Sequence, residues 1–305
     1  TWIFRDISFN ANQWRGWDFS GENIFDGGNI GIYGQFKNYW SLSVGTSRQD
    51  ESLSSTALRG GPSLLYPGGW GSWLGIYSDN RKDLCFRAGG YMFWGDTGSR
   101  RYKNYWTGLT FRPNSAITVS VTPSYSLNEN LLQYVSTVEL GSENRYIFAT
   151  INQKTLALTF RLNFSITPDL SIQFYAQPYI SVGGYSQFKQ IANPRATQFE
   201  DRYQLIDQDQ IGYDAVDNIY HFDDDLDGSI DYSIENPDFK FLEFRFNLVL
   251  RWEYRPGSTV YLVWSQGRTD CTEDATFNIG PGMRDLFTVE PHNVFLVKFT
   301  YRFNF

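Results

Sequence analysis

The sequence is poor in the residues that most often carry catalysis or covalent cross-links. Its 305 residues include only 2 cysteines, 2 histidines and 2 methionines. Cys85 lies in a strand-like stretch and Cys271 in a distant loop, so a disulfide between them cannot be assumed. Cysteine usage therefore does not identify the redox compartment of the protein. His221 and His292 lie in segments predicted as loops, and neither belongs to a recognisable nucleophile motif. Residues for nucleophilic or acid–base catalysis are therefore few.

The sequence also lacks any apolar run of about 18 residues, which excludes a membrane-spanning helix. Lys and Arg number 26 against 33 Asp and Glu, a net charge of −7. Nucleic acid is excluded as the main partner because phosphate binding needs clustered basic residues, whereas acidic loops suit a cation. Aromatic residues make up 18% and there are 27 glycines, which is typical of strands and turns. We therefore predict an all-β protein.

Long segments alternate between apolar and polar residues. In the segment 294–305, one face carries Phe295, Val297, Phe299, Tyr301, Phe303 and Phe305. The other face carries Leu296, Lys298, Thr300, Arg302 and Asn304. The same period recurs in 155–166 and 240–254, over lengths that exceed the usual strand of about five to six residues. A membrane-spanning strand needs about nine to eleven tilted residues with apolar side chains toward lipid, so the lengths favour a transmembrane β-barrel over a soluble pair of β-sandwiches.

Turn spacing predicts the layout of this barrel. We expect about fourteen antiparallel up-and-down strands, near residues 2–12, 28–36, 39–48, 70–78, 84–95, 102–112, 116–126, 131–140, 144–152, 155–167, 170–183, 240–254, 259–268 and 293–305. Tight turns are expected at residues 37–38, 80–82, 113–114, 142–144, 168–169 and 255–258. They alternate with links that are often long, at 49–69, 184–239 and 269–292. Outer-membrane barrels have short periplasmic turns and long extracellular loops, so both termini are expected in the periplasm.

Residues 1–305 are thus predicted to form one transmembrane domain, with 184–239 as a long acidic extracellular loop. Tyr and Trp near strand ends, as in Lys37–Trp40 and Lys103–Trp106, are typical of the headgroup level, although core aromatics of a soluble protein are the alternative. A barrel has no sheet edges, so the last strand is expected to pair with the first and to contact outer-membrane lipid. No signal-peptide pattern is present at Thr1, from which we expect an upstream region to be missing.

Four stretches resemble one protein family: Arg59–Pro62, Ser78–Asp83, Thr155–Lys189 and Asn247–Gln266. They are similar to the C-terminal outer-membrane barrel of a Bacteroidota family of unassigned function. Its members usually carry an N-terminal domain similar to family-9 carbohydrate-binding modules, and no such domain is present in this sequence. The terminal aromatic residue likewise resembles the signal that the barrel-assembly machinery reads. The resemblance implies an outer-membrane location and a barrel architecture, and it implies no reaction. Sugar binding by the missing module is not carried over to these residues, so a glycan-related role is a separate hypothesis.

The segment HFDDDLDGSIDY in the longest loop has the spacing of a calcium loop. Its candidate ligands are Asp223, Asp225, Asp227, Ser229, Asp231 and Glu235. Position 12 of the motif is Ile234, so Glu235 is one residue late, and Glu200 or Asp238 is an alternative last ligand. The same loop without an ion would be a solvated acidic segment that repels itself. We expect structural Ca²⁺ here, and no catalytic residue or other cofactor.

Three functions stay open at this point. The polar faces of the strands mix both charge signs, from Arg161 to Arg302, which predicts cross-strand ion pairs in the lumen wall as readily as a transport path. The protein is expected to act in surface binding or transport. The alternatives are a scaffold within a larger complex of surface proteins, and a hydrolase at the barrel rim that uses a histidine beside a serine or aspartate. The turn at Arg59–Pro62 is a further candidate for substrate contact, if its loop folds inward.

Overall fold

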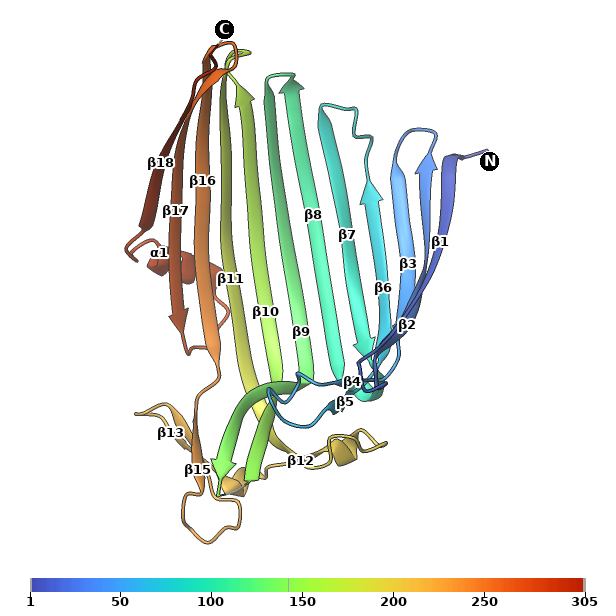
Figure 1. The fold of residues 1–305 in the computed structure, drawn as a ribbon, viewed down its shortest axis with the longest axis vertical. Helices are drawn as coiled ribbons and strands as arrows, with labels where there is room; N and C mark the ends of the chain where they lie inside the picture. The colour runs from blue at the N-terminus through green and yellow to red at the C-terminus, as the bar shows by residue number, and fades with distance from the viewer. Residues whose placement is uncertain (1, 142, 304–305) are drawn as a thin grey trace.

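The computed structural model describes residues 2–141 and 143–303, and its main feature is a 13-stranded antiparallel sheet (Figure 1). Neighbours along the sheet follow the chain in an up-and-down order. In that order the strands are β1 (Phe4–Trp17), β2 (Asn23–Phe36), β3 (Ser41–Gln49), β6 (Gly69–Tyr77), β7 (Leu84–Gly95), β8 (Arg100–Asn114), β9 (Ile117–Leu140), β10 (Glu143–Ser165), β11 (Leu170–Ile191), β16 (Phe239–Arg255), β17 (Ser258–Thr272) and β18 (His292–Thr300). The thirteenth, β12 (Tyr203–Leu205), pairs with β11 off this path. The all-β, up-and-down prediction is confirmed.

The remaining elements are small and belong to the links. They are the hairpin β4 (Ser52–Ser54) with β5 (Leu64–Tyr66), the sheet β13 (Ile211–Asp214), β14 (Ile219–Phe222) and β15 (Tyr232–Glu235), the 3-10 turns η1 (Asp96–Gly98), η2 (Glu200–Arg202) and η3 (Gln208–Gln210), and the helix α1 (Ile279–Leu286). In the described part of the chain, no helix combines the length and apolar character needed to cross a membrane.

Short turns and long links lie at opposite ends of the sheet. Both chain ends lie at the short-turn end (Figure 1), as the alternation of link lengths predicted. The link between β9 and β10 differs from the prediction, because this tight turn lies at the long-loop end. Gly141 has a φ of 63° there, a conformation that glycine adopts without strain. The predicted turn also included Ser142, which lies outside the described residues.

Two pairs of predicted strands are each one strand, and the main sheet has 13 strands where about fourteen were expected. Segments 116–126 and 131–140 are both parts of β9, which has 24 residues, and 144–152 and 155–167 fall in β10, which has 23. The residues between the segments, 127–130 and 153–154, include no glycine or proline that would favour a turn. Leu127 pairs with Lys154 and Asn128 with Gln153 straight through the supposed links. The path from β1 to β18 therefore has twelve strands.

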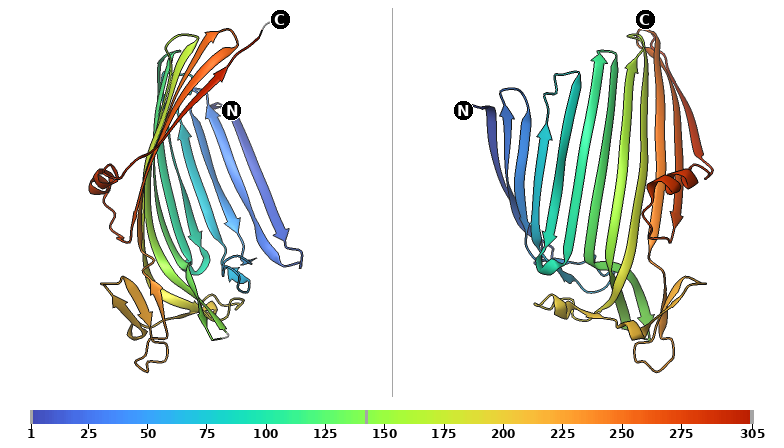
Figure 2. Two further views of the ribbon diagram at one scale, coloured as in Figure 1. Left: turned by 60° about the vertical axis from the view of Figure 1, so that its left-hand side comes forward. Right: turned by 180° about the vertical axis from the view of Figure 1, so that it is seen from behind.

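The strand register brings the predicted apolar faces together on one side of the sheet. Leu162 pairs with Phe174, Phe174 with Leu248, Leu248 with Trp264, and Trp264 with Phe295. Directly paired residues point to the same face of a sheet, so these side chains share one face. Helix α1 stands on this face (Figure 2), which we call the outer face. The prediction of which residues of the last strand share the apolar face is thus confirmed for the described residues. Asn304 and Phe305 lie outside them.

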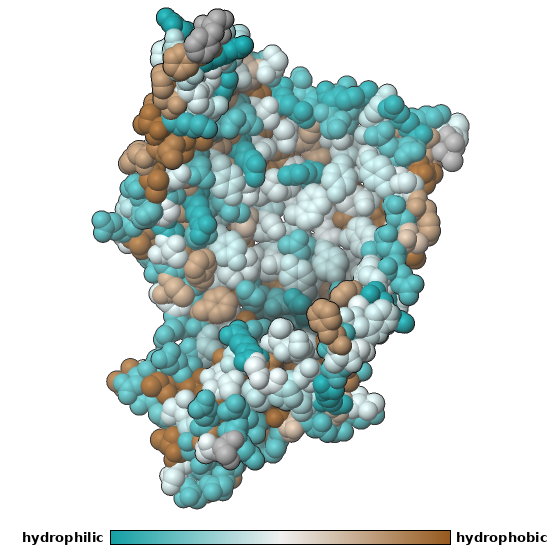
Figure 3. All heavy atoms as spheres, in the orientation of Figure 1, coloured by the Kyte–Doolittle hydropathy of each residue, from teal (hydrophilic) through white to brown (hydrophobic). Residues whose placement is uncertain are grey.

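The opposite, concave face, which we call the inner face, is toward the viewer in Figure 1. It is coloured mostly teal and white in Figure 3, as expected for polar and aromatic residues. By register it carries the predicted polar set of Arg161, Asn163, Gln173, Gln177, Glu243, Arg245, Asn247, Arg251, Glu253 and Lys298. The sheet therefore has a polar concave side and an apolar convex side, the reverse of a water-soluble half-barrel.

The prediction that the last strand pairs with the first is wrong for this structure. Within residues 2–141 and 143–303, β1 pairs with β2 alone and β18 with β17 alone. The two edges stand apart across the open side of the curved sheet (Figures 1 and 2). Closure requires a matching strand number, tilt and stagger. Alternation in the sequence fixes which face each residue occupies and leaves those three quantities undetermined.

At the long-loop end, β9, β10 and β11 extend beyond their neighbours and pack with residues 50–68 and 192–238. We call this assembly the cap, and the rest of the sheet the wall. The cap has two apolar clusters. The first contains Leu58, Leu64, Leu132, Phe148, Ile191 and Phe199, and the second contains Ile147, Ala149, Phe188, Phe222, Tyr232 and Ile234. The cap is thus built like a small soluble domain, with its own buried core.

Arg202 joins the two long links of the cap. Its side chain is 1% exposed, and its guanidinium donates to the carbonyl oxygens of Leu65 at 2.9 Å and Ala196 at 2.8 Å. It also pairs with Glu51 at 2.5 Å. A buried arginine is tolerated only when its donors are satisfied, so these bonds hold the link 192–238 against the link 50–68.

Candidate functional sites

The acidic loop connects β14 to β15 in the cap, and the structure brings three of its carboxylates together. Ligand oxygens of Asp223, Asp225 and Asp227 all lie within 4.8 Å of one another. Oxygen atoms from alternate residues of a tight loop are the ligand set that Ca²⁺ prefers. Asp225 and Asp227 are exposed and Asp223 is half-buried, so an ion could enter from solvent.

Backbone N–H groups hold this loop in shape. Asp223 accepts hydrogen bonds from the backbone N–H of Gly228 at 2.9 Å and of Asp227 at 3.2 Å, and Asp227 accepts one from Ser229 N–H at 2.7 Å. Gly228 has a φ of 89°, which allows the sharp bend predicted for the glycine of a calcium loop. The loop therefore curls around its own carboxylates.

The other predicted acidic ligands do not join this group of carboxylates. Asp231 accepts a hydrogen bond from Asp224 N–H at 2.8 Å. Glu235 pairs with Ile219 at the far end of the hairpin, three residues along the strand and about 10 Å from the loop. Asp238 accepts from Tyr185 N–H at 2.6 Å, and burial raises the pKa of its carboxyl. The hairpin register, which spacing did not reveal, separates Glu235 from the cluster.

His221 meets the distance condition for a histidine–serine pair. Its Nδ1 atom lies 2.7 Å from Oγ of Ser233, which is directly opposite on β15. In the described chain, no carboxylate is hydrogen-bonded to the other ring nitrogen, so the group that would orient the base is missing. His292 lies on β18 opposite Gly267 and is exposed. The pair is a cross-strand contact at the surface of a small sheet.

The C-terminal half of the inner face is charged and internally paired. Glu243 pairs with Arg245 at 2.6 Å, and Arg251 pairs with Glu253 at 2.6 Å. Both pairs run along β16, whereas the sequence predicted ion pairs between strands. Residues two apart on a strand share a face and reach each other when one side chain is long. Among the described residues, Arg161 and Lys298 on the same half form no ion pair and lie over the rings of Tyr175 and Tyr261. This half of the wall is therefore only partly charge-balanced.

The N-terminal half of the inner face is aromatic, which the sequence reading missed. The ring of Trp73 lies over Gly31 and Gly45, and the ring of Trp106 over Gly89, so closely that a Cβ on any of these glycines would crowd the indole. The hydroxyl end of Tyr91 covers Gly71 in the same way. Glycine lets a ring lie flat against the backbone and leaves its other side toward the concavity.

The sequence contains one signal for these aromatic rings, which is that glycines on one strand are paired with Trp or Tyr on the neighbouring strand. It appears only once the register is known, because Gly45 and Trp73 are paired residues of β3 and β6. Amide and hydroxyl groups lie beside the rings on the same face. Asn104 donates to Ser124 at 3.2 Å and Arg87 donates to Thr122 at 3.0 Å. Flat rings next to polar side chains are the usual surroundings of a bound sugar or other ring-shaped polar solute.

The turn at Arg59–Pro62 packs on the cap. Arg59 has a φ of 47° and Gly60 a φ of 113°, and the Arg59 guanidinium lies 4.3 Å from the ring centre of Tyr134. This loop therefore folds inward onto β9, beside a pocket of about 390 Å³ that Tyr66 and Tyr134 also line. Cys85 and Cys271 are both free thiols, on β7 and at the far end of β17.

A family model described as a domain of unknown function, DUF5916, matches residues 2–305. The chain belongs to this family. Among solved structures, a chain described as the copper transporter OprC is similar, with a TM-score of 0.45 and 10% sequence identity over 97% of this chain. The match covers 42% of that chain, so the DUF5916 chain spans less than half of its length. No curated protein matches the sequence.

Proposed function

We propose that this protein spans the outer membrane of a Gram-negative bacterium, with its outer face in lipid and its inner face lining a water-filled passage. The observation that carries the proposal is the apolar band on the outer face. On β16 it runs from Leu242, which helix α1 covers, to the exposed Trp252. These are about eleven residues, which is the span that a tilted strand needs to cross a bilayer. Phe295 and Val297 are 72% and 71% exposed, which would be costly in water.

The ends of the band support an orientation. At the long-loop end the outer face turns charged, with Arg48 paired to Asp96 at 2.7 Å and Lys240 paired to Asp274 at 2.6 Å. We place the cap at the cell surface and the short turns in the periplasm, as in outer-membrane barrels. Outer-membrane lipid and the barrel-assembly machinery are then the expected partners, and a Bacteroidota origin is part of the same proposal.

The solute that we propose is a carbohydrate, bound or passed along the aromatic half of the inner face. Trp73, Tyr91 and Trp106 offer flat rings, and a sugar ring packs its C–H face on such surfaces while its hydroxyls bond to nearby amides and hydroxyls. Asn104 and Ser124 are groups of that kind on the same face. The cap lies across the long-loop end of the sheet, where it would control entry.

Intrinsic tryptophan fluorescence during titration with oligosaccharides tests this proposal. The protein is reconstituted in vesicles, and the double variant Trp73→Ala and Trp106→Ala is expected to lose the response. The matched control is Trp264→Ala, because this tryptophan is on the outer face. Equal binding by all three proteins would disprove carbohydrate binding at the inner face. Extraction of the protein by salt without detergent would disprove the membrane location itself.

We propose separately that Asp223, Asp225 and Asp227 bind a structural Ca²⁺, with water or backbone oxygens completing the shell. Bound Ca²⁺ would offset the repulsion among these carboxylates and order the loop. The double variant Asp225→Asn and Asp227→Asn should lose calcium-dependent protection of the loop from protease. Asp217→Asn, an exposed acid of the same link, is the control. Identical digestion of wild type with calcium and with chelator would remove this proposal.

A barrel-rim hydrolase is the second candidate, favoured only by the contact between His221 and Ser233. A fluorophosphonate probe labels activated serines, so it separates the two functions. We expect no labelling of Ser233, because the pair lacks an orienting acid. Labelling that is lost in Ser233→Ala would favour the enzyme. A pure scaffold role predicts neither solute binding nor labelling, together with partners that co-purify in detergent.

A further inference from the structure

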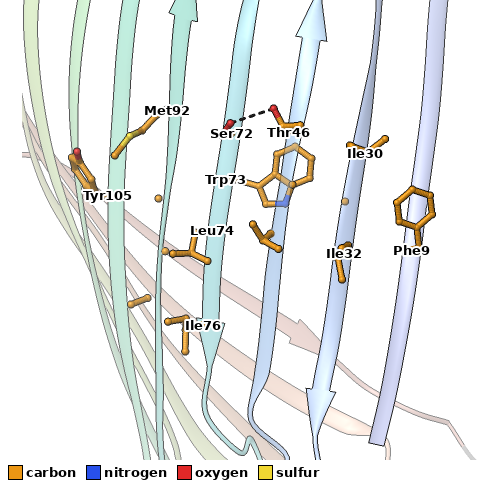
Figure 4. Close-up of a pocket in the computed structure, with 16 residues that line it drawn as sticks. Phe9, Ile30, Ile32, Thr46, Ser72, Trp73, Leu74, Ile76, Met92 and Tyr105 are labelled. Carbon is orange, nitrogen blue, oxygen red and sulfur yellow. Dashed lines mark hydrogen bonds between the residues drawn. The ribbon is translucent and has the colours of Figure 1, made fainter. Parts of the chain in front are cut away.

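The outer face is hollowed over β3, β6 and β7 (Figure 4). The hollow is a groove of about 750 Å³, and its walls are almost entirely apolar. Its larger lining side chains include Ile32, Val44, Leu74, Ile76, Met92 and Tyr105. Ser72, Ala88 and Gly90 line it as well, and their small side chains leave the space open between larger neighbours. This groove has the size and chemistry to hold acyl chain rather than a polar solute.

The long-loop end of the groove leads into three basic side chains. Met92 pairs with Lys103, Lys103 with Leu127, and Leu127 with Lys154. These residues form one row across β7, β8, β9 and β10 on the outer face, with strands about 4.8 Å apart. Arg101 lies in the next row, opposite Trp94. Arg101, Lys103 and Lys154 also line a smaller pocket of about 250 Å³.

These three cations are unpaired, which sets them apart from their neighbours. Across the described chain, none of them has an ion pair within 4.0 Å, whereas Arg15, Arg48 and Lys240 at the same end of the outer face are each paired with a carboxylate. Glu129 is directly opposite Arg101 and yet forms no ion pair with it. Even with Glu129 counted, the cluster has an excess of positive charge.

We infer that this groove and its basic end form a binding site for an anionic phospholipid. The acyl chain lies in the groove between β3 and β7, and the phosphate is held by Arg101, Lys103 and Lys154. The cluster lies where the apolar band ends, which is the depth of the lipid headgroups in the proposed orientation. Lys and Arg side chains reach along an apolar surface and keep their charge at that depth. The inference rests on the proposed membrane location.

Lipid retention measured by native mass spectrometry tests the inference. Wild-type protein is first floated with vesicles of phosphatidylglycerol and phosphatidylcholine, and then exchanged into detergent. We expect phosphatidylglycerol to be retained in preference to phosphatidylcholine. The triple variant Arg101→Gln, Lys103→Gln and Lys154→Gln should reduce that preference at least about tenfold. The control, Arg161→Gln with Arg245→Gln and Lys298→Gln, removes the same charge from the inner face and should retain the preference.

A second variant tests the groove without changing charge. Ala88→Leu fills its floor and should lower retention of phosphatidylglycerol, while circular dichroism and vesicle flotation stay as in the wild type. An unchanged lipid preference in the triple variant would overturn the inference and leave the membrane location intact. Displacement of the lipid by inorganic phosphate alone would show a simple anion site, which also overturns it. Failure of wild type to float would instead reject the proposed function.

Discussion

The wall and the cap place their apolar side chains in opposite ways. In the cap, Leu58 is 0% and Phe148 1% exposed, inside clusters covered by polar loops. In the wall, Phe295 and Phe299 are exposed on the convex face, and Arg161 and Glu243 line the concave face. The buried core of the cap is the arrangement expected in water, whereas the exposed apolar face of the wall is the arrangement expected in hydrocarbon. The boundary lies where β9, β10 and β11 leave the sheet.

The comparison predicts that the cap can lose its core without loss of the wall. Phe148→Ala removes a fully buried ring and should lower the stability of the cap by about 3–5 kcal/mol. Hydrogen exchange should show loss of protection in the cap and unchanged protection in β16 and β17. Phe19→Ala changes an exposed ring of the first loop and should have no effect. If β16 and β17 lost protection together with the cap, the two regions would be one cooperative unit.

In the wall, the effect of a charge should depend on the face alone. Leu248→Lys places a cation near the middle of the outer band and should cost about 2–4 kcal/mol in a bilayer. Asn247→Lys adds the same charge one residue away on the inner face, and its cost should stay under about 1 kcal/mol. Urea unfolding of both variants in vesicles measures the difference. Equal costs would contradict the assignment of lipid to the outer face.

The aromatic half of the wall depends on bare backbone beneath its rings. Gly45→Ala should cost about 1–3 kcal/mol because the new methyl group collides with the ring of Trp73. At Gly267 nothing lies within 4 Å of an added Cβ, so Gly267→Ala on β17 should be neutral. The same unfolding assay checks both. A neutral Gly45→Ala would mean that Trp73 moves freely and does not form a fixed platform.

The smallest expected effect concerns a buried lysine of the cap. Lys189 is 2% exposed, and burial lowers the pKa of its ammonium to about 8. The folded cap binds this proton less tightly than the unfolded chain, so cap stability should rise as the pH increases from 8 to 9.5, by about 1 kcal/mol. Lys189→Met should remove this rise, as measured by hydrogen exchange. A pH dependence that persists in the variant would assign it to other groups, such as the tyrosines.

The sequence predicted the faces well because alternation is a local property. Each of Phe244, Leu248 and Trp252 lies where the period of two placed it. Strand boundaries were harder, since Asn128 and Gln153 read as a link although their backbones pair in mid-ladder. The acidic loop was predicted as a group of six ligands, and three come together. Glu235 is separated from the three carboxylates by the register of the hairpin, which cannot be inferred from residue spacing.

The sequence by itself determined that this chain forms long antiparallel strands with one apolar and one polar face, because both follow from contacts between neighbours along the chain. Only the tertiary structure decided which residues meet across strands. It set Trp73 over Gly45, and it placed Lys103 beside Met92 and Lys154 beside Leu127. Within the described residues, it left β1 and β18 unpaired with each other. Strand register and sheet curvature depend on contacts throughout the sheet, so they cannot be predicted from any short segment of the sequence.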